Sequence, residues 1–140
     1  MRKIIFASHH RLASGMKDTL NYIAPNAANV TAIDAYMTNT PVEKEIDDAL
    51  KTVDLKNDEV LVFTDMMGGS VNQNFIKYIS YPHFHIIAGM SLPLVLTIIL
   101  ALPEGFIDPE QLRNSIEEAK EQVFYVNDKA KDMAIDEDDE

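Results

Sequence analysis

The 140-residue chain contains no cysteine and no tryptophan, and it has only five glycines. Without cysteine, neither a disulfide framework nor a thiolate metal site is possible, which suits a reducing cytoplasm. Positive charge is also scarce, because 12 basic residues face 23 acidic ones and give a net charge of −11. A surface of this sign opposes binding to nucleic acid, whose phosphates require basic side chains.

Long hydrophobic runs are missing as well. The most apolar segment, residues 92–102, is far shorter than the ~20 residues that cross a bilayer. The apolar stretch at residues 4–7 is too short for the core of a signal peptide and meets polar residues at once. We therefore expect a soluble cytoplasmic protein with one compact domain at residues 1–130. The acidic residues 131–140 are typical of a disordered tail.

Apolar runs of strand length alternate with helical patterns along the chain. Strands are predicted at residues 3–8, 30–36, 59–64 and 83–89, and helical spacing of apolar residues follows each of them. Capping boxes with proline at the first helical position are predicted at residues 40–43 and 108–111. The pattern predicts an open, doubly wound α/β fold, with four mostly parallel strands and helices on both faces. A short antiparallel fifth strand is predicted at residues 123–126.

In such folds, ligands bind at the carboxyl ends of the strands, near the point where the strand order reverses. Two of the loops predicted there hold a histidine, a carboxylate and a glycine-rich turn. A neutral imidazole exposes a nitrogen lone pair, so His9 is a candidate phosphoryl acceptor. Asp65 would hold the proton on the other ring nitrogen. The turn Gly68-Gly69-Ser70 leads into a helix N-terminus, whose N–H groups and hydroxyl would bind phosphoryl oxygens.

These residues also have simpler interpretations. A histidine at a strand end is commonly a polar surface residue, and Gly-Gly-Ser occurs in many loops. Taken alone, they leave an anion-handling site and an ordinary surface loop both open. His83 and His85 are predicted at the far end of the fourth strand, away from this site. The pair Met66-Met67 is interpreted as a hydrophobic contact surface.

Three segments together resemble the mannose/fructose/sorbose family of enzyme IIA proteins. Ser8-His9-His10-Arg11-Leu12-Ala13 is similar to the family's small-Thr/Ser-His-Gly-x-x-Ala. Residues 65–72 are similar to Asp-x-x-Gly-Gly-Ser-Pro-x-Asn, and residues 86–94 to Ile-Ala-Gly-x-Asn-x-Pro-Met/Leu. The motifs stand in the order and spacing of the family, and the resemblance covers the chain from residue 3 to about 127.

The resemblance implies a phosphohistidine carrier of the bacterial phosphoenolpyruvate-dependent sugar phosphotransferase system. The phosphoryl group would come from the histidine-containing phosphocarrier protein and pass to enzyme IIB, with the membrane components IIC and IID acting further along. No metal or other cofactor is implied, and the protein would be a homodimer in which the fifth strand pairs across subunits. The implied site residues are His9 as acceptor, Asp65 as its partner, Gly68, Gly69 and Ser70 as phosphoryl ligands, and His10, Arg11 and Ser91 as further contributors.

The sequence departs from the family pattern at three places. His10 stands where glycine is usual, Val71 stands where proline is usual, and Met66-Met67 lacks the usual aromatic residue. Three other functions remain open: the related phosphotransfer subunit of dihydroxyacetone kinase, a regulatory module that senses phosphorylation, and a binding domain of flavodoxin type. The Gly-Gly-Ser turn favours the sugar transport family.

Overall fold

A computed structural model describes residues 1–131, and its centre is one four-stranded sheet. The strands are β1 (Arg2–His9), β2 (Val30–Ala35), β3 (Glu59–Thr64) and β4 (Phe84–Ala88). Their order across the sheet is β2-β1-β3-β4, and all three neighbouring pairs are parallel. The predicted doubly wound α/β fold is therefore confirmed for its four main strands.

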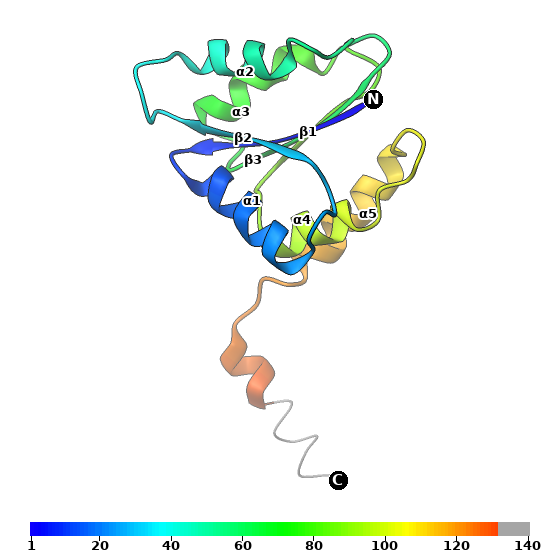
Figure 1. The fold of residues 1–140 in the computed structure, drawn as a ribbon. Coiled ribbons are helices and arrows are strands. Elements are labelled where there is room, and N and C mark those ends of the chain that lie inside the picture. Colours follow the sequence, from blue (N-terminus) through cyan, green and yellow to red (C-terminus); the bar gives the residue numbers. More distant parts are fainter. Residues whose placement is uncertain (132–140) are drawn as a thin grey trace.

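Helices cover both faces of the sheet (Figure 1). One face carries α1 (Leu12–Ile23), α4 (Leu92–Ile99) and α5 (Pro109–Lys120). The other face carries α2 (Val42–Leu50) and α3 (Ser70–Phe75), and a 3-10 turn at Ile76–Tyr78 continues α3. Two hydrophobic cores result, one on each side of the strands.

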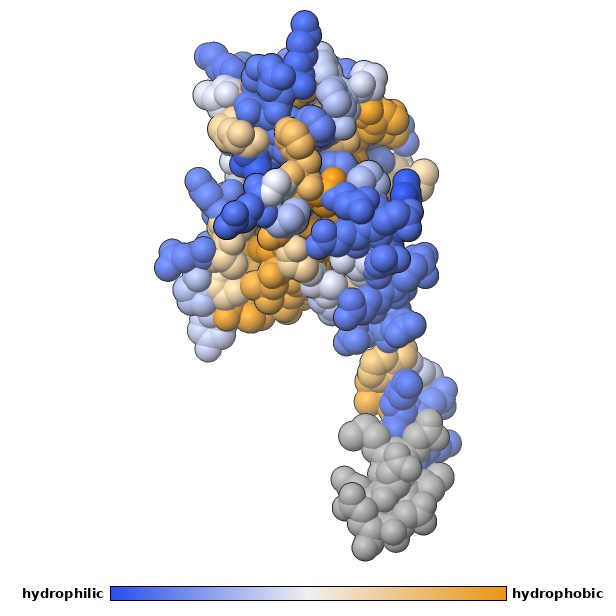
Figure 2. All heavy atoms as spheres, turned by 90° about the vertical axis from the view of Figure 1, so that its right-hand side faces the viewer, coloured by the Kyte–Doolittle hydropathy of each residue, from blue (hydrophilic) through white to orange (hydrophobic). Residues whose placement is uncertain are grey.

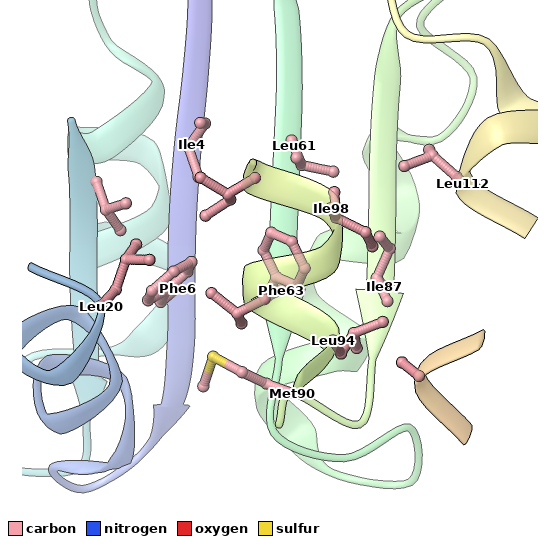
Figure 3. Packing of buried hydrophobic residues seen from close by; sticks show 14 of the residues in the cluster. Ile4, Phe6, Leu20, Leu61, Phe63, Ile87, Met90, Leu94, Ile98 and Leu112 are labelled. Carbon is pink, nitrogen blue, oxygen red and sulfur yellow. The ribbon is translucent and has the colours of Figure 1, made fainter. Parts of the chain in front are cut away.

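Successive strand residues feed these two cores in turn. Ile4 and Phe6 of β1 pack in the core between the sheet and helices α1 and α4. Ile5 and Ala7 pack in the core between the sheet and helices α2 and α3. Figure 3 shows the first of these cores, with Phe6 and Phe63 from the sheet facing side chains of α1 and α4. Because both faces are covered, all six residues of β3 are buried, which explains the apolar run at its centre, residues 60–63.

Helix α1 buries only part of the apolar stripe formed by Leu12, Met16, Leu20 and Ile23. Leu12 and Ile23 belong to the apolar spacing, yet they are 49% and 48% exposed, while Ala13 and Leu20 are fully buried. Two hydrogen bonds at the start of the helix set its rotation. The Ser8 hydroxyl accepts from the Ala13 N–H at 2.7 Å, and an Asp34 carboxylate oxygen accepts from the Ser14 N–H at 3.0 Å. Both acceptors come from strands, so the sheet itself caps this helix.

Neither of the two predicted capping boxes forms in full. Before α5, the helix start is as predicted, because the Asp108 carboxylate accepts from the Glu110 N–H at 3.0 Å and proline follows at the first helical position, but the Gln111 side chain donates to the Ala101 carbonyl at 2.8 Å instead of back to Asp108. Before α2, Pro41 itself occupies the cap position with extended backbone, and no side chain caps the helix. The Thr40 hydroxyl is instead bonded to the Thr38 hydroxyl at 3.1 Å.

The predicted fifth strand is not formed within the single chain. Residues 123–125 have no regular structure and residues 126–131 are helical. This segment leaves α5 and points away from the sheet of its own chain, and it pairs with neither edge strand there, β2 or β4 (Figure 1). The predicted acidic tail lies, except for Lys131, outside the described residues. Among residues 1–131, no helix has both the length and the apolar character required to cross a membrane.

A buried polar network ties the amino ends of the strands together. Glu59, at the start of β3, is only 2% exposed and accepts from Arg2 Nε at 2.6 Å and from the Ile107 N–H at 2.7 Å. The same guanidinium donates to the carbonyls of Pro103 and Gly105 at 2.8 and 2.7 Å. His85 of β4 lies with its Nε2 3.8 Å from Glu59, and this nitrogen is buried without a hydrogen-bond partner.

Candidate phosphoacceptor site

The carboxyl ends of β1 and β3 lie side by side at the point where the strand order reverses. The chain runs from β1 outward to β2 on one side, and it then returns to place β3 on the other side of β1. His9 is the last residue of β1, and Asp65 directly follows the last residue of β3. The topology therefore brings together the histidine and the carboxylate that the sequence predicts at this edge.

Asp65 holds His9 by two hydrogen bonds. Its Oδ2 atom lies 2.6 Å from Nδ1 of the His9 ring and accepts from the His9 backbone N–H at 2.8 Å. A carboxylate only accepts hydrogen bonds, so Nδ1 carries the ring proton and Nε2 keeps its lone pair. The His9 side chain is 39% exposed and that of Asp65 only 9%, which makes the imidazole the accessible member of the pair.

The charge state of Asp65 follows from the same contacts. Partial burial on its own raises the pKa of the carboxyl group. The hydrogen bonds from the backbone and ring of His9, and from the Met66 N–H at 3.0 Å, outweigh this effect, so the pKa lies below its ordinary value. Asp65 is therefore an anion at neutral pH and can stabilise positive charge on the imidazole.

A buried amide fixes the loop that follows Asp65. Asn72 of α3 is 4% exposed, and its carbonyl accepts from the Thr64 hydroxyl at 2.7 Å. Its Nδ2 donates to the backbone carbonyl of Met67 at 3.2 Å. The amide thus ties the end of β3 and the middle of the loop to α3, which holds the glycine turn in place beside His9.

Gly69 approaches the imidazole more closely than any other residue type would allow. A Cβ atom built on Gly69 would lie 2.8 Å from Cε1 of His9 and 3.1 Å from Cγ of Met66. Contacts under 3.0 Å essentially never occur for a real Cβ, so any larger residue here would force the His9 ring or the turn to shift. At Gly68, by contrast, an added Cβ would meet open space.

Tyr36 belongs to the site, although the sequence does not single it out. Its ring lies 5.4 Å from the His9 ring, centroid to centroid, at an interplanar angle of 30°. Its hydroxyl is hydrogen-bonded to the hydroxyl of Ser70, the first residue of α3. The backbone of Tyr36 is left-handed, with φ of 66°. Such a conformation costs a bulky residue about 1–2 kcal/mol and cannot be read from the sequence.

Three further residues, His10, Arg11 and Ser91, are predicted contributors to the site. His10 has φ of 53°, a conformation that glycine adopts without strain, and its N–H donates to the carbonyl of Ala35 at 2.8 Å. The backbone therefore keeps the course that the family's glycine would allow. The side chains of His10 and Arg11 are exposed. The Ser91 hydroxyl accepts from the Leu94 N–H at 3.3 Å and caps α4.

The chain is similar to several known proteins. Residues 3–117 match the protein family described as PTS system fructose IIA component. A structure from Klebsiella pneumoniae, assigned as a phosphoenolpyruvate-dependent sugar phosphotransferase system (PTS) permease, is 29% identical with a TM-score of 0.81. That similarity covers 90% of this chain and 91% of the other. No curated protein sequence matches the chain significantly.

Two further structures are similar in fold. The mannose/sorbose specific IIA subunit from Enterococcus faecalis is 20% identical with a TM-score of 0.75, over 89% of this chain and 93% of the other. The IIA protein associated with the fucose utilization operon of Streptococcus pneumoniae is 23% identical with a TM-score of 0.74, over 92% and 96%.

Proposed function

Because the chain belongs to the family of fructose IIA components of the phosphotransferase system, we propose that it is a phosphohistidine carrier for sugar uptake. It accepts a phosphoryl group on His9 from the histidine-containing phosphocarrier protein and passes it to enzyme IIB, which serves the membrane components IIC and IID. The observation that carries this proposal is the 2.6 Å contact between Nδ1 of His9 and Asp65, which leaves Nε2 free to react.

The chemistry is a reversible displacement at phosphorus. The Nε2 lone pair of His9 attacks the phosphorus atom of the donor's phosphohistidine, and the donor's N–P bond breaks with its electron pair returning to the donor ring. No proton has to leave the His9 ring. Its positive charge grows as the bond forms, and the Asp65 carboxylate stabilises it through Nδ1–H. Transfer to enzyme IIB is the same displacement with His9 as the leaving group.

The glycine turn is the proposed phosphoryl binding site. The contact between Gly69 and Cε1 of His9 brings the backbone of this turn next to the reacting side of the ring. Backbone N–H groups at Gly68 and Gly69 and the hydroxyl of Ser70 would donate to the phosphoryl oxygens. The Gly69 N–H donates to the Met66 carbonyl at 3.4 Å in the unphosphorylated protein, so it would have to be shared with the phosphoryl group. We assign no chemical step to His10 or Arg11, whose exposed side chains are accessible to a docked partner.

We also propose that the carrier works in the cytoplasm as a homodimer. Val123, Phe124, Tyr125 and Val126 are between 48% and 84% exposed, an apolar stretch that a single chain leaves uncovered. Hydrophobic surface is visible on the narrow segment between the body and the grey atoms in Figure 2. Contact with a second subunit would remove this surface from water.

The test is reconstitution with purified components. With enzyme I, the phosphocarrier protein and labelled phosphoenolpyruvate, the protein should acquire an acid-labile, alkali-stable label. Addition of enzyme IIB should then discharge it. A protein that is labelled but not discharged by any enzyme IIB from a phosphotransferase operon would act as a sensor of phosphorylation, and an unlabelled protein would exclude the carrier function.

A further inference from the structure

Tyr36 connects three segments that meet at the phosphoacceptor. It follows directly after β2, its ring lies against the His9 ring at the end of β1, and its hydroxyl bonds the Ser70 hydroxyl at the start of α3. Tyr36 thus interacts with both the acceptor histidine and the predicted phosphoryl ligand Ser70.

The backbone is arranged so that this contact forms. The carbonyl of Ala35 accepts from the His10 N–H at 2.8 Å, which fixes the end of β2 beside the end of β1. The next residue, Tyr36, then adopts φ of 66°. A bulky residue is a genuine outlier in this region, and such outliers gather at functional sites. The Tyr36 side chain is also 44% exposed, so core packing does not account for its conformation.

We propose that Tyr36 is a positioning residue for phosphoryl transfer at His9, acting through the hydroxyl of Ser70. The proposal rests on the function proposed above. In the phosphorylated state the Tyr36 hydroxyl donates a hydrogen bond to Ser70 Oγ, and the Ser70 hydroxyl donates a hydrogen bond to a phosphoryl oxygen. The Tyr36 ring meanwhile covers one side of the imidazole.

The direction of the hydrogen bonds follows from the charge of the ligand. In the unphosphorylated protein either hydroxyl can donate to the other. A phosphoryl group has only acceptor oxygens, so the Ser70 hydroxyl must act as the hydrogen-bond donor when the phosphoryl group binds. Ser70 Oγ then needs another donor, and the Tyr36 hydroxyl is already in place. A hydroxyl that accepts a hydrogen bond is also polarised into a stronger donor, so the two bonds reinforce each other.

The ring makes a separate contribution. The imidazole becomes positively charged as the phosphoryl group is attached, and an aromatic ring stabilises a cation placed within about 6 Å of its centroid. The rings of Tyr36 and His9 are 5.4 Å apart, within that range. The Tyr36 ring also shields one side of the phosphohistidine from water, which is the competing acceptor of the phosphoryl group.

The experiment is a double-mutant cycle read by rapid-quench transfer from the phosphorylated phosphocarrier protein. Tyr36→Phe should slow transfer about threefold to tenfold, as expected for loss of one hydrogen bond. Ser70→Ala should slow it at least as much. The double variant should be no slower than Ser70→Ala alone, because the phenol acts only through Ser70. Tyr22→Phe, at an 87% exposed position of α1, is the matched control and should transfer at the wild-type rate.

Each outcome decides the proposal. Independent effects that multiply in the double variant would overturn the relay through Ser70, as would a Tyr36→Phe rate equal to wild type. Equal lifetimes of the phosphohistidine in Tyr36→Leu and Tyr36→Phe would overturn the role of the ring, since only the first variant removes it. Unchanged urea midpoints in these variants would show that the rates do not reflect unfolding. If the wild-type chain takes no label on His9, the proposed function and this inference fall together, whereas a labelled wild type with a flat cycle rejects the inference alone.

Discussion

A single oxygen of Asp65 contacts His9 twice, at 2.8 Å from the backbone nitrogen and at 2.6 Å from Nδ1 of the ring. The first contact fixes where β1 ends, and the second fixes which ring nitrogen carries the proton. Backbone position and ring tautomer are therefore set by the same carboxylate, and a change at Asp65 alters both.

Replacing Asp65 with asparagine should slow phosphoryl transfer by roughly 10²–10⁴. The amide cannot stabilise a cationic imidazole, and its NH₂ group can donate to Nδ1 and favour the wrong tautomer. Rapid-quench kinetics measures the rate, and ¹⁵N NMR of the ring reports the tautomer. Asp18→Asn, at an exposed position of α1, is the matched control. A wild-type rate in Asp65→Asn would remove the carboxylate from the mechanism.

His9→Ala should abolish labelling by phosphoenolpyruvate, whereas His10→Ala should retain it. The two histidines are adjacent, but only His9 is hydrogen-bonded to Asp65 through its ring. Mass spectrometry after alkaline digestion locates the phosphoryl group. Because alanine at residue 10 must adopt the left-handed backbone seen there, His10→Gly is the better-tolerated second control. Label that survives in His9→Ala and disappears in His10→Ala would show that His10, and not His9, is the acceptor.

Gly69→Ala should damage transfer with the acceptor histidine still present. The added Cβ would lie 2.8 Å from Cε1 of His9, so either the ring or the turn must move. A displacement of about 1 Å costs on the order of 10²-fold in rate. Gly15→Ala in α1, where an added Cβ meets nothing within 4 Å, should transfer normally. Equal rates in the two variants would mean that the turn does not contact the reacting ring.

Because of His85, stability should fall as the pH drops below about 6.5, the ordinary pKa of a histidine side chain. Burial lowers the pKa of His85, the carboxylate of Glu59 raises it, and His83 lowers it, with a net decrease. Arg2 is paired with Glu59, and its positive charge reduces the stabilisation that Glu59 gives to protonated His85. As the pH falls, His85 is protonated in the unfolded chain before it is protonated in the folded chain. Stability is therefore lost between about pH 6.5 and the lower pKa of His85 in the folded protein.

Urea unfolding of wild type and His85→Gln at several pH values measures this contribution. Glutamine does not titrate, so the stability of wild type relative to the variant should decline as the pH falls from about 7 to about 5. A difference that stays constant across this range would show that His85 does not couple folding to protons.

Deleting residues 121–140 should convert a homodimer to a monomer, and deleting residues 133–140 should not. The first deletion removes the exposed apolar side chains at 123–126, which are proposed to face a second subunit. The shorter deletion removes residues outside the described structure. Light scattering on the full chain and both truncations gives the mass. A monomeric full-length chain would contradict the dimer, and a monomer after the short deletion would assign the contact to the acidic residues.

Most of the framework can be predicted from the sequence because each strand is a short apolar run between helical patterns. The buried strand β3 was predicted with the bounds it has, and Asp65 follows it. The parallel topology then places His9 and Asp65 at one edge without further information. Side-chain identity and strand order are sufficient for this pair.

The rest depends on backbone geometry and on partners distant in the chain. Tyr36 enters the site through a left-handed φ, which no neighbouring residue signals. Leu12 belongs to the apolar stripe of α1, yet it is exposed, because Ser8 and Asp34 cap the helix and orient it so that Ala13 faces the core. The apolar residues at 123–126 have strand character, yet a strand forms only where an edge is within reach, and this segment points away from the sheet.

The polar network and the acceptor site lie at opposite ends of the sheet, which affects how the sequence of such a protein can change in evolution. At the amino ends, Arg2 and Glu59 are tied to each other and to residues 103–107. At the carboxyl ends, the exposed side chains of Tyr36, Met66 and Met67 make no contact with that network. A lineage can therefore exchange residues around the acceptor, and so adapt to a new partner protein, without compensating changes in the Arg2–Glu59 network at the opposite end of the sheet.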